Sequence, residues 1–179
     1  MTTLMEQKQP ATQAVTTPRR SRFKTILRYG LVGIVLLGLA IQFVPYGRAH
    51  ANPAVVAEPH WDSGQARQLF TQACADCHSN TTIWPWYSNV APLSWLIQKH
   101  VDEGRAAFNA SEMGRPENKA DEAAEYVQKG EMPIANYTWL HPEARLSAAD
   151  KETLINGLLA TFGGEAEAGA VKVSEEHEE

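Results

Sequence analysis

Cysteine is nearly absent from this chain of 179 residues, and both examples, Cys74 and Cys77, lie in the short sequence CADCH. Without a second cysteine pair, a structural zinc site would lack the four ligands that it normally needs. Alternating strand patterns are also scarce, which excludes the β and α context in which a thioredoxin-like dithiol begins a helix. We find no Ser-His-Asp pattern, phosphate-binding loop or paired-carboxylate motif, so the sequence does not support the enzyme classes that depend on them.

Negative charge is almost missing from the first 28 residues, which contain only Glu6 against six basic side chains: Lys8, Arg19, Arg20, Arg22, Lys24 and Arg28. An apolar stretch, residues 26–44, follows directly and contains Arg28 as its only charged residue. A membrane-spanning helix needs roughly 20 largely apolar residues, and Arg28 can extend its charge toward the headgroups. The sequence therefore predicts a single-pass transmembrane anchor at 26–44.

The basic cluster before this anchor predicts its orientation, because positive segments stay on the cytoplasmic side. We therefore expect an inner-membrane protein whose C-terminal domain lies in the periplasm. A cleaved signal peptide is the alternative, since Ala49-His50-Ala51 fits the small-x-small cleavage pattern. The long basic leader and the long apolar stretch favour a retained anchor.

The remaining chain divides into three expected parts around one domain. Residues 1–25 are expected to form a disordered cytoplasmic tail, and residues 45–60, with Pro45, Pro53 and Pro59, an extended linker that lifts the domain off the membrane. Residues 61–162 form the domain itself. Residues 163–179 contain six Glu against Lys172 alone, and we expect an acidic disordered tail there.

Helical periodicity dominates residues 61–162, and four helices are expected, each with a terminal signal. The first covers 63–77 with Ser63 as N-cap, and the second follows Asn89 or Ser88 and ends at Gly104. The third covers 117–129 with Gly130 as C-cap, and the fourth runs from Ser147 to Gly163. Their predicted apolar faces are Ala66, Leu69, Phe70 and Ala73; Leu93, Leu96, Ile97, His100 and Val101; Ala120, Ala123, Ala124 and Val127; and Leu154, Ile155, Leu158, Leu159 and Phe162.

The predicted fold is therefore all-α: a small helical domain of about four helices behind one N-terminal transmembrane helix. Two long aromatic loops, IWPWY and NYTWLHPEARL, are expected between the helices.

In an exported, helical chain, C-x-x-C-H is the attachment sequence of c-type haem. Two intervening residues place both sulfurs on one helical turn, where they can form thioethers with the porphyrin edge. The next residue, His78, then turns its imidazole toward the iron as an axial ligand. We therefore expect one covalently attached haem c, bound by Cys74 and Cys77, with His78 as a metal ligand.

The second axial ligand is less constrained by the sequence. Met132 lies 54 residues after His78 in KGEMPI, between a helix-ending Gly130 and Pro133, and shortly before the last helix. Small cytochromes c present their methionine in this arrangement, so Met132 is the favoured ligand. His100, Met113, His141 and an open site remain alternatives, whereas His50, His60 and His177 lie in the linker or tail.

Two motifs resemble the bacterial haem-binding domain family, whose members are membrane-anchored c-type haem proteins with a cytochrome c-like core. They are CADCHSNTTIWPWYSNVAPLSWLIQKHVDEGR and GEMPIANYTWLHPEARLS followed by the final helix. The resemblance covers about Trp61 to Phe162 and implies one covalent haem held at Cys74, Cys77 and His78. It also implies that aromatic side chains surround the haem: Trp84, Trp86, Tyr87 and Trp95. Met113 departs from the family, which tends to have an aromatic residue there.

These features predict electron transfer by a mono-haem cytochrome rather than enzymatic catalysis. Ligation by His78 and Met132 would raise the iron potential, as electron carriers require. The alternative is a haem enzyme or sensor, a peroxidase or gas-binding protein, with a labile or absent sixth ligand. Two partners are expected. One is the membrane, contacted through the N-terminal helix, and the other is a redox protein, either alone or within a membrane complex. No nucleic-acid partner is expected.

Overall fold

The computed structural model describes residues 19–174, with side chains for 22–163, and divides into two units at Phe43. Most of the expected N-terminal tail (1–18) and the end of the expected acidic tail (175–179) lie outside the described residues. The first unit is helix α1 (Arg19–Ala40), continued by the 3-10 helix η1 (Ile41–Phe43). Residues Arg22–Phe43 are long and apolar enough to cross a membrane, by length and composition.

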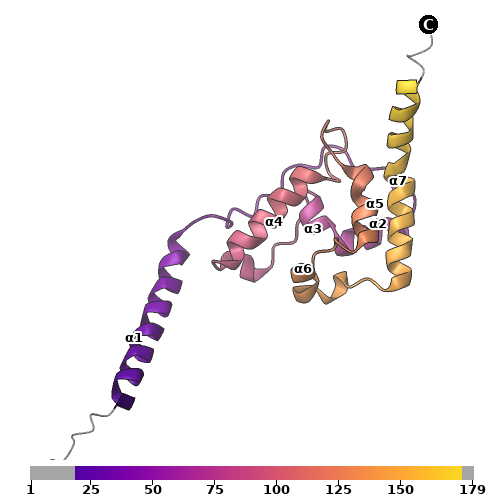
Figure 1. The fold of residues 1–179 in the computed structure, drawn as a ribbon. Coiled ribbons are helices and arrows are strands. Elements are labelled where there is room, and N and C mark those ends of the chain that lie inside the picture. The colour runs from indigo at the N-terminus through magenta and orange to yellow at the C-terminus, as the bar shows by residue number, and fades with distance from the viewer. Residues whose placement is uncertain (1–18, 175–179) are drawn as a thin grey trace, which may run out of the picture. The chain divides into compact units, whose positions relative to one another are not determined.

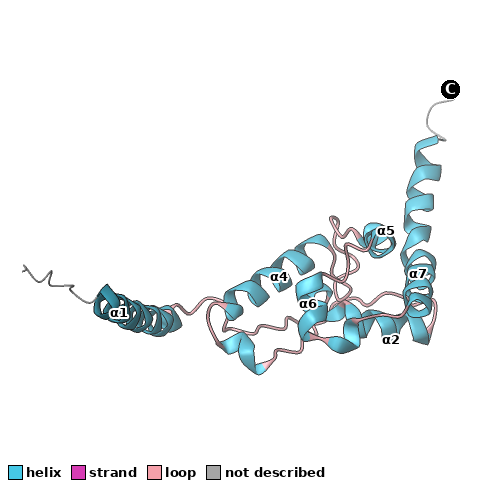
Figure 2. Cartoon of the chain, turned by 60° about the horizontal axis from the view of Figure 1, so that its bottom comes forward, coloured by secondary structure: helices cyan, strands magenta, loops and turns pink. Residues whose placement is uncertain are grey.

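The second unit, from Val44 onward, is built from helices (Figures 1 and 2). They are α2 (Gly64–Ala73), α3 (Ala75–His78), η2 (Trp86–Asn89), α4 (Leu93–Ala107), η3 (Ala120–Glu122), α5 (Ala123–Lys129), α6 (Ala135–Leu140), η4 (Pro142–Ala144) and α7 (Ala148–Ser174). Within residues 19–174 there is no strand, only an isolated bridge between Ala57 and Glu112. The all-α prediction is confirmed, although the short helices raise the number above four.

Three of the predicted caps occur where the sequence placed them, whereas neither Asn89 nor Ser88 caps α4, whose N-cap is Pro92. Ser63 Oγ accepts a hydrogen bond from the Ala66 amide at 3.1 Å, and Ser147 Oγ accepts one from the Asp150 amide at 3.1 Å. Gly130 ends α5 with φ +75°, a left-handed conformation that favours glycine.

Five predicted helix ends are wrong. Helix α4 begins at Leu93 rather than just after Asn89 or Ser88, and α5 begins at Ala123, after η3, rather than at 117. The first helix stops at Ala73 because Cys74 leaves helical geometry, with φ −130° and ψ −34°. Gly104 lies inside α4, and Gly163 lies inside α7, which continues to Ser174. Glycine weakens a helix by only about 1 kcal/mol, so the surrounding residues can carry a helix through it.

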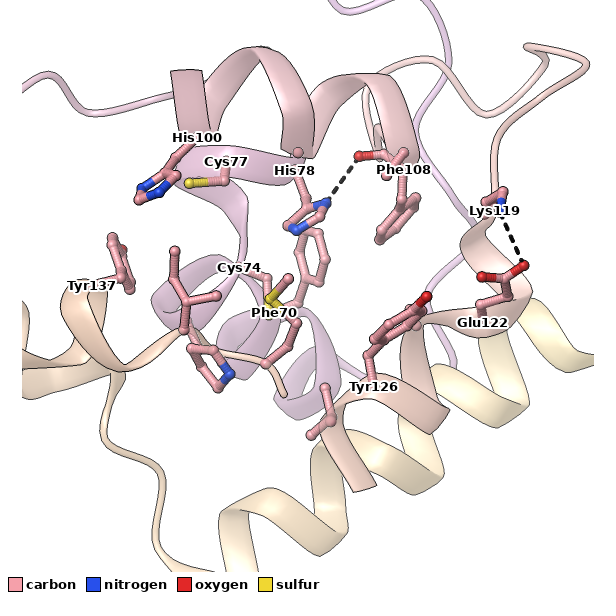
Figure 3. Close-up of a pocket in the computed structure, with 18 of the residues that line it drawn as sticks. Phe70, Cys74, Cys77, His78, His100, Phe108, Lys119, Glu122, Tyr126 and Tyr137 are labelled. Carbon is pink, nitrogen blue, oxygen red and sulfur yellow. Dashed lines mark hydrogen bonds and ion pairs between the residues drawn. The ribbon is translucent and has the colours of Figure 1, made fainter. Parts of the chain in front are cut away.

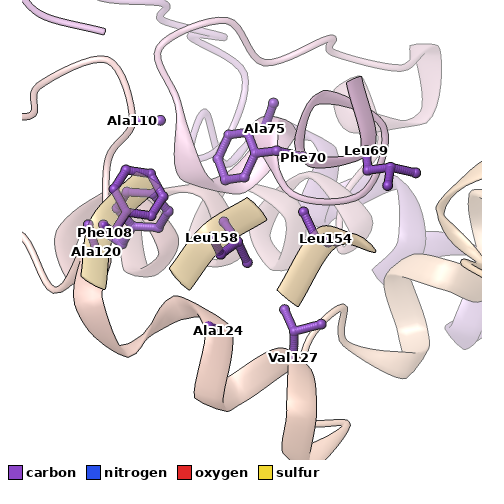
Figure 4. Packing of buried hydrophobic residues seen from close by; sticks show 11 residues of the cluster. Leu69, Phe70, Ala75, Phe108, Ala110, Ala120, Ala124, Val127, Leu154 and Leu158 are labelled. Atoms are coloured by element: carbon purple, nitrogen blue, oxygen red, sulfur yellow. The ribbon is translucent and has the colours of Figure 1, made fainter. Parts of the chain in front are cut away.

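The core lies where α7 packs on α2 and α5 (Figure 4). Leu154, Leu158 and Phe162 of α7 are buried, and they face Phe70 of α2 and Val127 of α5 in one cluster. The predicted apolar faces of α2, α5 and α7 thus supply most of the core, but Leu159, predicted on the α7 face, is 52% exposed. The first and last helices of the domain, α2 and α7, pack together.

The predicted apolar face of α4 is only partly correct. Leu93 and Leu96 are 40% and 43% exposed, whereas the buried positions of α4 are Ser94, Val101 and Gly104. The helix buries its small residues, since these allow neighbouring backbone to approach closely. The two expected aromatic loops also contain helices, namely η2 and α6.

Residues 45–60 are extended, but they are bound to the domain rather than standing away from it. His50 Nε2 lies 2.9 Å from Ser88 Oγ, and the Asn52 amide donates to the Thr82 carbonyl at 2.9 Å. Further along, the Val56 amide donates to the carbonyl of Ser111 at 2.9 Å. The segment therefore does not act as a free spacer.

Candidate functional site

One cavity of about 520 Å³ opens into the domain between α2, α3, α4, α5 and the segment before α6 (Figure 3). Its size falls in the range of small-molecule and cofactor sites. Five residues singled out from the sequence line it together: Cys74, Cys77, His78, His100 and Met132. The structure therefore brings the predicted attachment residues and the two leading candidates for the second ligand into one site.

The CADCH sequence forms the turn between α2 and α3. The Cys74 amide still donates to Phe70 O at 2.8 Å, closing α2, while the His78 amide donates to Cys74 O at 2.9 Å. Both cysteines are free thiols that reach the cavity, as Figure 3 shows. Burial raises the pKa of the Cys74 thiol to about 12, and burial together with Asp76 raises the pKa of Cys77 to about 11. Both sulfurs are therefore neutral, as suits an apolar cofactor edge.

The His78 imidazole is oriented by the backbone of the segment after α4. Its Nδ1 lies 3.1 Å from the Phe108 carbonyl, so Nδ1 holds the proton and Nε2 is the nitrogen available to a metal. Figure 3 shows this bond and the ring lying at the cavity between His100 and Phe108. Burial lowers the pKa of His78, against the effect of its backbone hydrogen bonds, and so favours the neutral form that binds metals.

Helix α4 approaches this turn closely at Gly104. A Cβ at Gly104 would lie 2.4 Å from the Cys77 carbonyl oxygen and 2.9 Å from Cys77 Cβ. Only glycine leaves room for this contact. The close approach places His100, one turn earlier on α4, on the cavity wall with the cysteines.

Met132 reaches the cavity from the segment that follows α5. Gly130 turns the chain, and the Met132 amide then donates to the Tyr126 carbonyl at 3.2 Å. The side chain is half-buried against the core cluster and lines the cavity. The short segment between α5 and Met132 is thus hydrogen-bonded back to α5. A loop that presents an iron ligand requires such a restraint.

The other described candidates for the second ligand lie elsewhere. Met113 packs on the core, with its sulfur 3.7 Å from Asn118 Nδ2. His141 lies between Tyr87 and Glu143, 3.0 Å from the hydroxyl of the first and from a carboxylate oxygen of the second. Neither lines the cavity, whereas His177 lies outside the described residues.

The aromatic residues that the resemblance placed around the haem do not line the cavity. Trp84 stacks on His50 with ring centroids 4.7 Å apart, and Trp86 is 79% exposed. Tyr87 and Trp95 likewise lie outside the cavity wall. Its aromatic rings are those of Phe70, Phe108, Tyr126 and Tyr137.

Sequence reasoning missed these four rings as cavity walls, because no local signal distinguishes them from ordinary core or loop aromatic residues. Tyr137 is the most informative of them: its hydroxyl donates to Asp76 Oδ2 at 2.9 Å. This bond connects the segment after Met132 to the CADCH turn. Burial is the main cause that raises the pKa of Tyr137, so its hydroxyl keeps its proton and remains a donor.

Two arginines near the site, Arg105 and Arg115, do not offer their charge to the cavity. The guanidinium of Arg105 instead donates to the Ser79 and Ala51 carbonyls at 2.8 and 2.9 Å. That of Arg115 donates to the Arg105 and Ala106 carbonyls, both at 2.8 Å. Among the described residues, Lys119 is the one lysine or arginine that lines the cavity. It forms an ion pair with Glu122.

These residues fit a haem. The wall offers two neutral thiols beside an oriented imidazole, a thioether and a second imidazole on the same cavity, and four aromatic rings, together with Glu103 and the ion pair of Lys119 and Glu122. The haem-binding domain family has a model that matches residues 36–160, which is more than half of the chain. The comparisons with curated proteins and with solved structures gave no match. The chain belongs to the haem-binding domain family, and the cavity lined by Cys74, Cys77 and His78 is its candidate haem site.

Proposed function

We propose that this protein is a mono-haem c-type cytochrome that transfers electrons from an exported, membrane-anchored domain. The observation that carries the proposal is the convergence of Cys74, Cys77, oriented His78 and Met132 on one cavity. A bound haem would supply the one-electron redox chemistry. The protein would hold it, set its axial ligands and limit its contact with water.

Cys74 and Cys77 attach the cofactor in this proposal. Each thiol adds across one vinyl group, so that a carbon-sulfur bond forms and the thiol hydrogen moves to the neighbouring vinyl carbon. The addition consumes no oxidant or reductant. The free state of both thiols and their position on the cavity wall support it.

His78 Nε2 and the Met132 sulfur are the proposed axial ligands. The Phe108 carbonyl holds His78 in the required tautomer, and the hydrogen bond from Met132 N to Tyr126 O restrains the methionine segment. A histidine and methionine pair suits an electron carrier because it raises the iron potential. His100 is the competing ligand, since it lines the same cavity from α4.

A haem enzyme or sensor is the second candidate function. His100 and Tyr137 both line the cavity and would lie beside the iron if Met132 left it or never bound. A peroxidase or gas-binding protein would use such an open position. The optical experiment below separates this candidate from the electron carrier.

The anchor and location form a separate part of the proposal. The apolar helix at Arg22–Phe43 would span the inner membrane, and the six basic residues before position 29 would remain in the cytoplasm. The haem domain would then face the periplasm. There its electrons would pass to a redox partner protein, either alone or within a membrane complex.

The test begins with haem staining of the purified full chain after a denaturing gel. Covalent haem stays with the protein, and the double variant Cys74→Ala/Cys77→Ala should lose it. Optical spectra then compare Met132→Ala with its matched control His100→Ala. Low-spin iron with a sulfur-to-iron charge-transfer band is expected in the wild type and in His100→Ala, and the band should disappear in Met132→Ala.

Three results would contradict the proposal. Loss of stain on the denaturing gel would exclude covalent attachment. Loss of low-spin iron in His100→Ala, with Met132→Ala unchanged, would transfer the ligand role to His100. Five-coordinate wild-type iron that binds CO rapidly would favour the enzyme or sensor.

A further inference from the structure

One end of the domain exposes several large apolar side chains. Residues 79–98 include no Asp, Glu, Lys or Arg but three tryptophans. In this stretch, η2 and the start of α4 pack on each other and expose Trp86 (79%), Val90 (41%), Leu93 (40%) and Leu96 (43%). We call these four side chains the apolar end of the domain. Such a patch on an exported domain indicates an interaction surface.

The chain enters the domain at this same end. Gly47 has φ +77°, and a Cβ there would lie 2.2 Å from the Ser94 carbonyl oxygen in the first turn of α4. Three residues later, His50 Nε2 is 2.9 Å from Ser88 Oγ in η2. Residues 47–50 are therefore held directly against the elements that expose the apolar end.

The tether to the apolar helix is very short. Only Val44, Pro45 and Tyr46 separate Phe43, where the candidate span ends, from Gly47. Four residue steps reach at most about 14 Å when fully extended, and each headgroup layer is itself about 5–7 Å thick. The first turn of α4 therefore cannot move far from the membrane surface.

We propose that the apolar end docks into the headgroup region of the bilayer, with Trp86 and Leu93 in contact with lipid. The inference rests on the proposed anchor. Tryptophan suits this depth because its ring is apolar and its N–H is polar. Tyr46, 48% exposed in the tether itself, belongs to the same class of interfacial residue.

The lack of charge in residues 79–98 is compatible with a lipid contact at this end. Residues 45–162 contain nine Lys and Arg against fourteen Asp and Glu, a net charge of −5. Anionic lipids repel such a domain, so only an uncharged side can approach them closely. The contact is apolar rather than electrostatic, and raising the salt concentration should not release it.

Docking here would also place the haem site near the membrane. Leu93, Leu96 and His100 recur at helical spacing on one face of α4, and His100 lines the cavity. The face that touches lipid therefore continues into the cavity wall. Electrons would exchange with a partner that lies in or on the same membrane.

The test uses site-specific photocrosslinking in the full-length protein, expressed in bacterial membranes. A benzophenone amino acid replaces Trp86 or Leu93, and, as the matched control, Leu159. Leu159 is 52% exposed on α7, which packs on α2, α5 and η3 at the other end of the domain from the start of α4 (Figures 1 and 2). Each irradiated chain is analysed by mass spectrometry for phospholipid adducts.

Phospholipid adducts at positions 86 and 93, unchanged in high salt and absent at 159, are the expected result. Absence of lipid adducts at 86 and 93 would overturn docking, and so would adducts to a protein at those positions. Equal lipid labelling at 159 would also overturn it, because the contact would then be nonspecific. Membrane fractionation and haem staining of the same samples report the anchor and the haem independently, so their failure is distinguishable.

Discussion

The close approach of Gly104 to Cys77 predicts that Gly104→Ala lowers the stability of the protein, whereas helix propensity alone predicts that it raises it. Gly104 lies inside α4, where replacing glycine by alanine normally stabilises a helix by about 1 kcal/mol. In this domain the added Cβ would lie 2.4 Å from the Cys77 carbonyl oxygen. Gly104→Ala should therefore destabilise the protein.

The magnitude follows from which atoms must move. The nearest neighbours are backbone atoms and Cβ of the CADCH turn, so no flexible side-chain end can give way. Overpacking costs about 1–3 kcal/mol, and a contact this short belongs at the upper end. After the helix-propensity gain is subtracted, we expect a net loss of about 2 kcal/mol, which lowers the melting temperature by roughly 10 °C in a domain of this size.

Thermal unfolding of the haem-loaded full chain in detergent measures this loss. Gly114→Ala is the matched control, because nothing lies within 4 Å of its added Cβ, and its melting temperature should stay level or rise slightly. Haem staining should also weaken in Gly104→Ala, since the displaced turn contains both attachment residues. An unchanged or higher melting temperature for Gly104→Ala would refute the close contact between α4 and the CADCH turn.

Three further substitutions test the helices that support the site, each by thermal or denaturant unfolding. Gly157→Ala should cost about 2 kcal/mol, because its Cβ would lie 2.3 Å from Ala66 Cβ where α7 crosses α2; a neutral result would refute that crossing. Ser63→Ala should cost about 1 kcal/mol by removing the acceptor for the Ala66 amide, and no loss would refute the cap. Leu154→Ala should cost about 2–5 kcal/mol because the side chain is fully buried, and a loss below 1 kcal/mol would contradict its place in the core.

The sequence predicted the elements whose signals are local. Capping by Ser63 and Ser147, the turn at Gly130, and the buried faces of α2, α5 and α7 depend on residues close together in the chain. The spacing of CADCH likewise predicted a single turn that presents two sulfurs and an imidazole. These features needed no knowledge of distant contacts.

The features that the sequence did not predict depend on distant partners. The face of α4 was misjudged because close packing, as at Gly104 and Cys77, decides which side is buried, and this packing favours small residues over leucines. The cavity rings were missed because Phe70, Phe108 and Tyr137 come from three separate segments. Their spacing along the chain has no common period.

The prediction of a linker at residues 45–60 missed the contacts between this segment and the domain for a related reason. A proline-rich, weakly apolar segment resembles a spacer, and nothing local marks which of its polar groups find partners. Asn80 supplies one partner from another part of the chain: its side-chain amide donates to Ala54 O at 3.0 Å and to Glu112 Oε1 at 3.0 Å. Its own Oδ1 accepts from buried Asn109 at 2.8 Å. Each bond joins positions at least 26 residues apart.

Arg105 connects the tether to the site and explains why that arginine is not free for a cofactor. Its guanidinium donates to Ala51 O and Asn52 Oδ1 in the tether-proximal segment, and to Ser79 O and Thr82 Oγ1 just after the CADCH turn. Five N–H donors in a fixed planar fork can hold several segments at once, which a lysine could not do. Because α4 also contains His100 on the cavity wall, one side chain joins residues 51–52, the segment just after the CADCH turn and the helix that lines the candidate haem site.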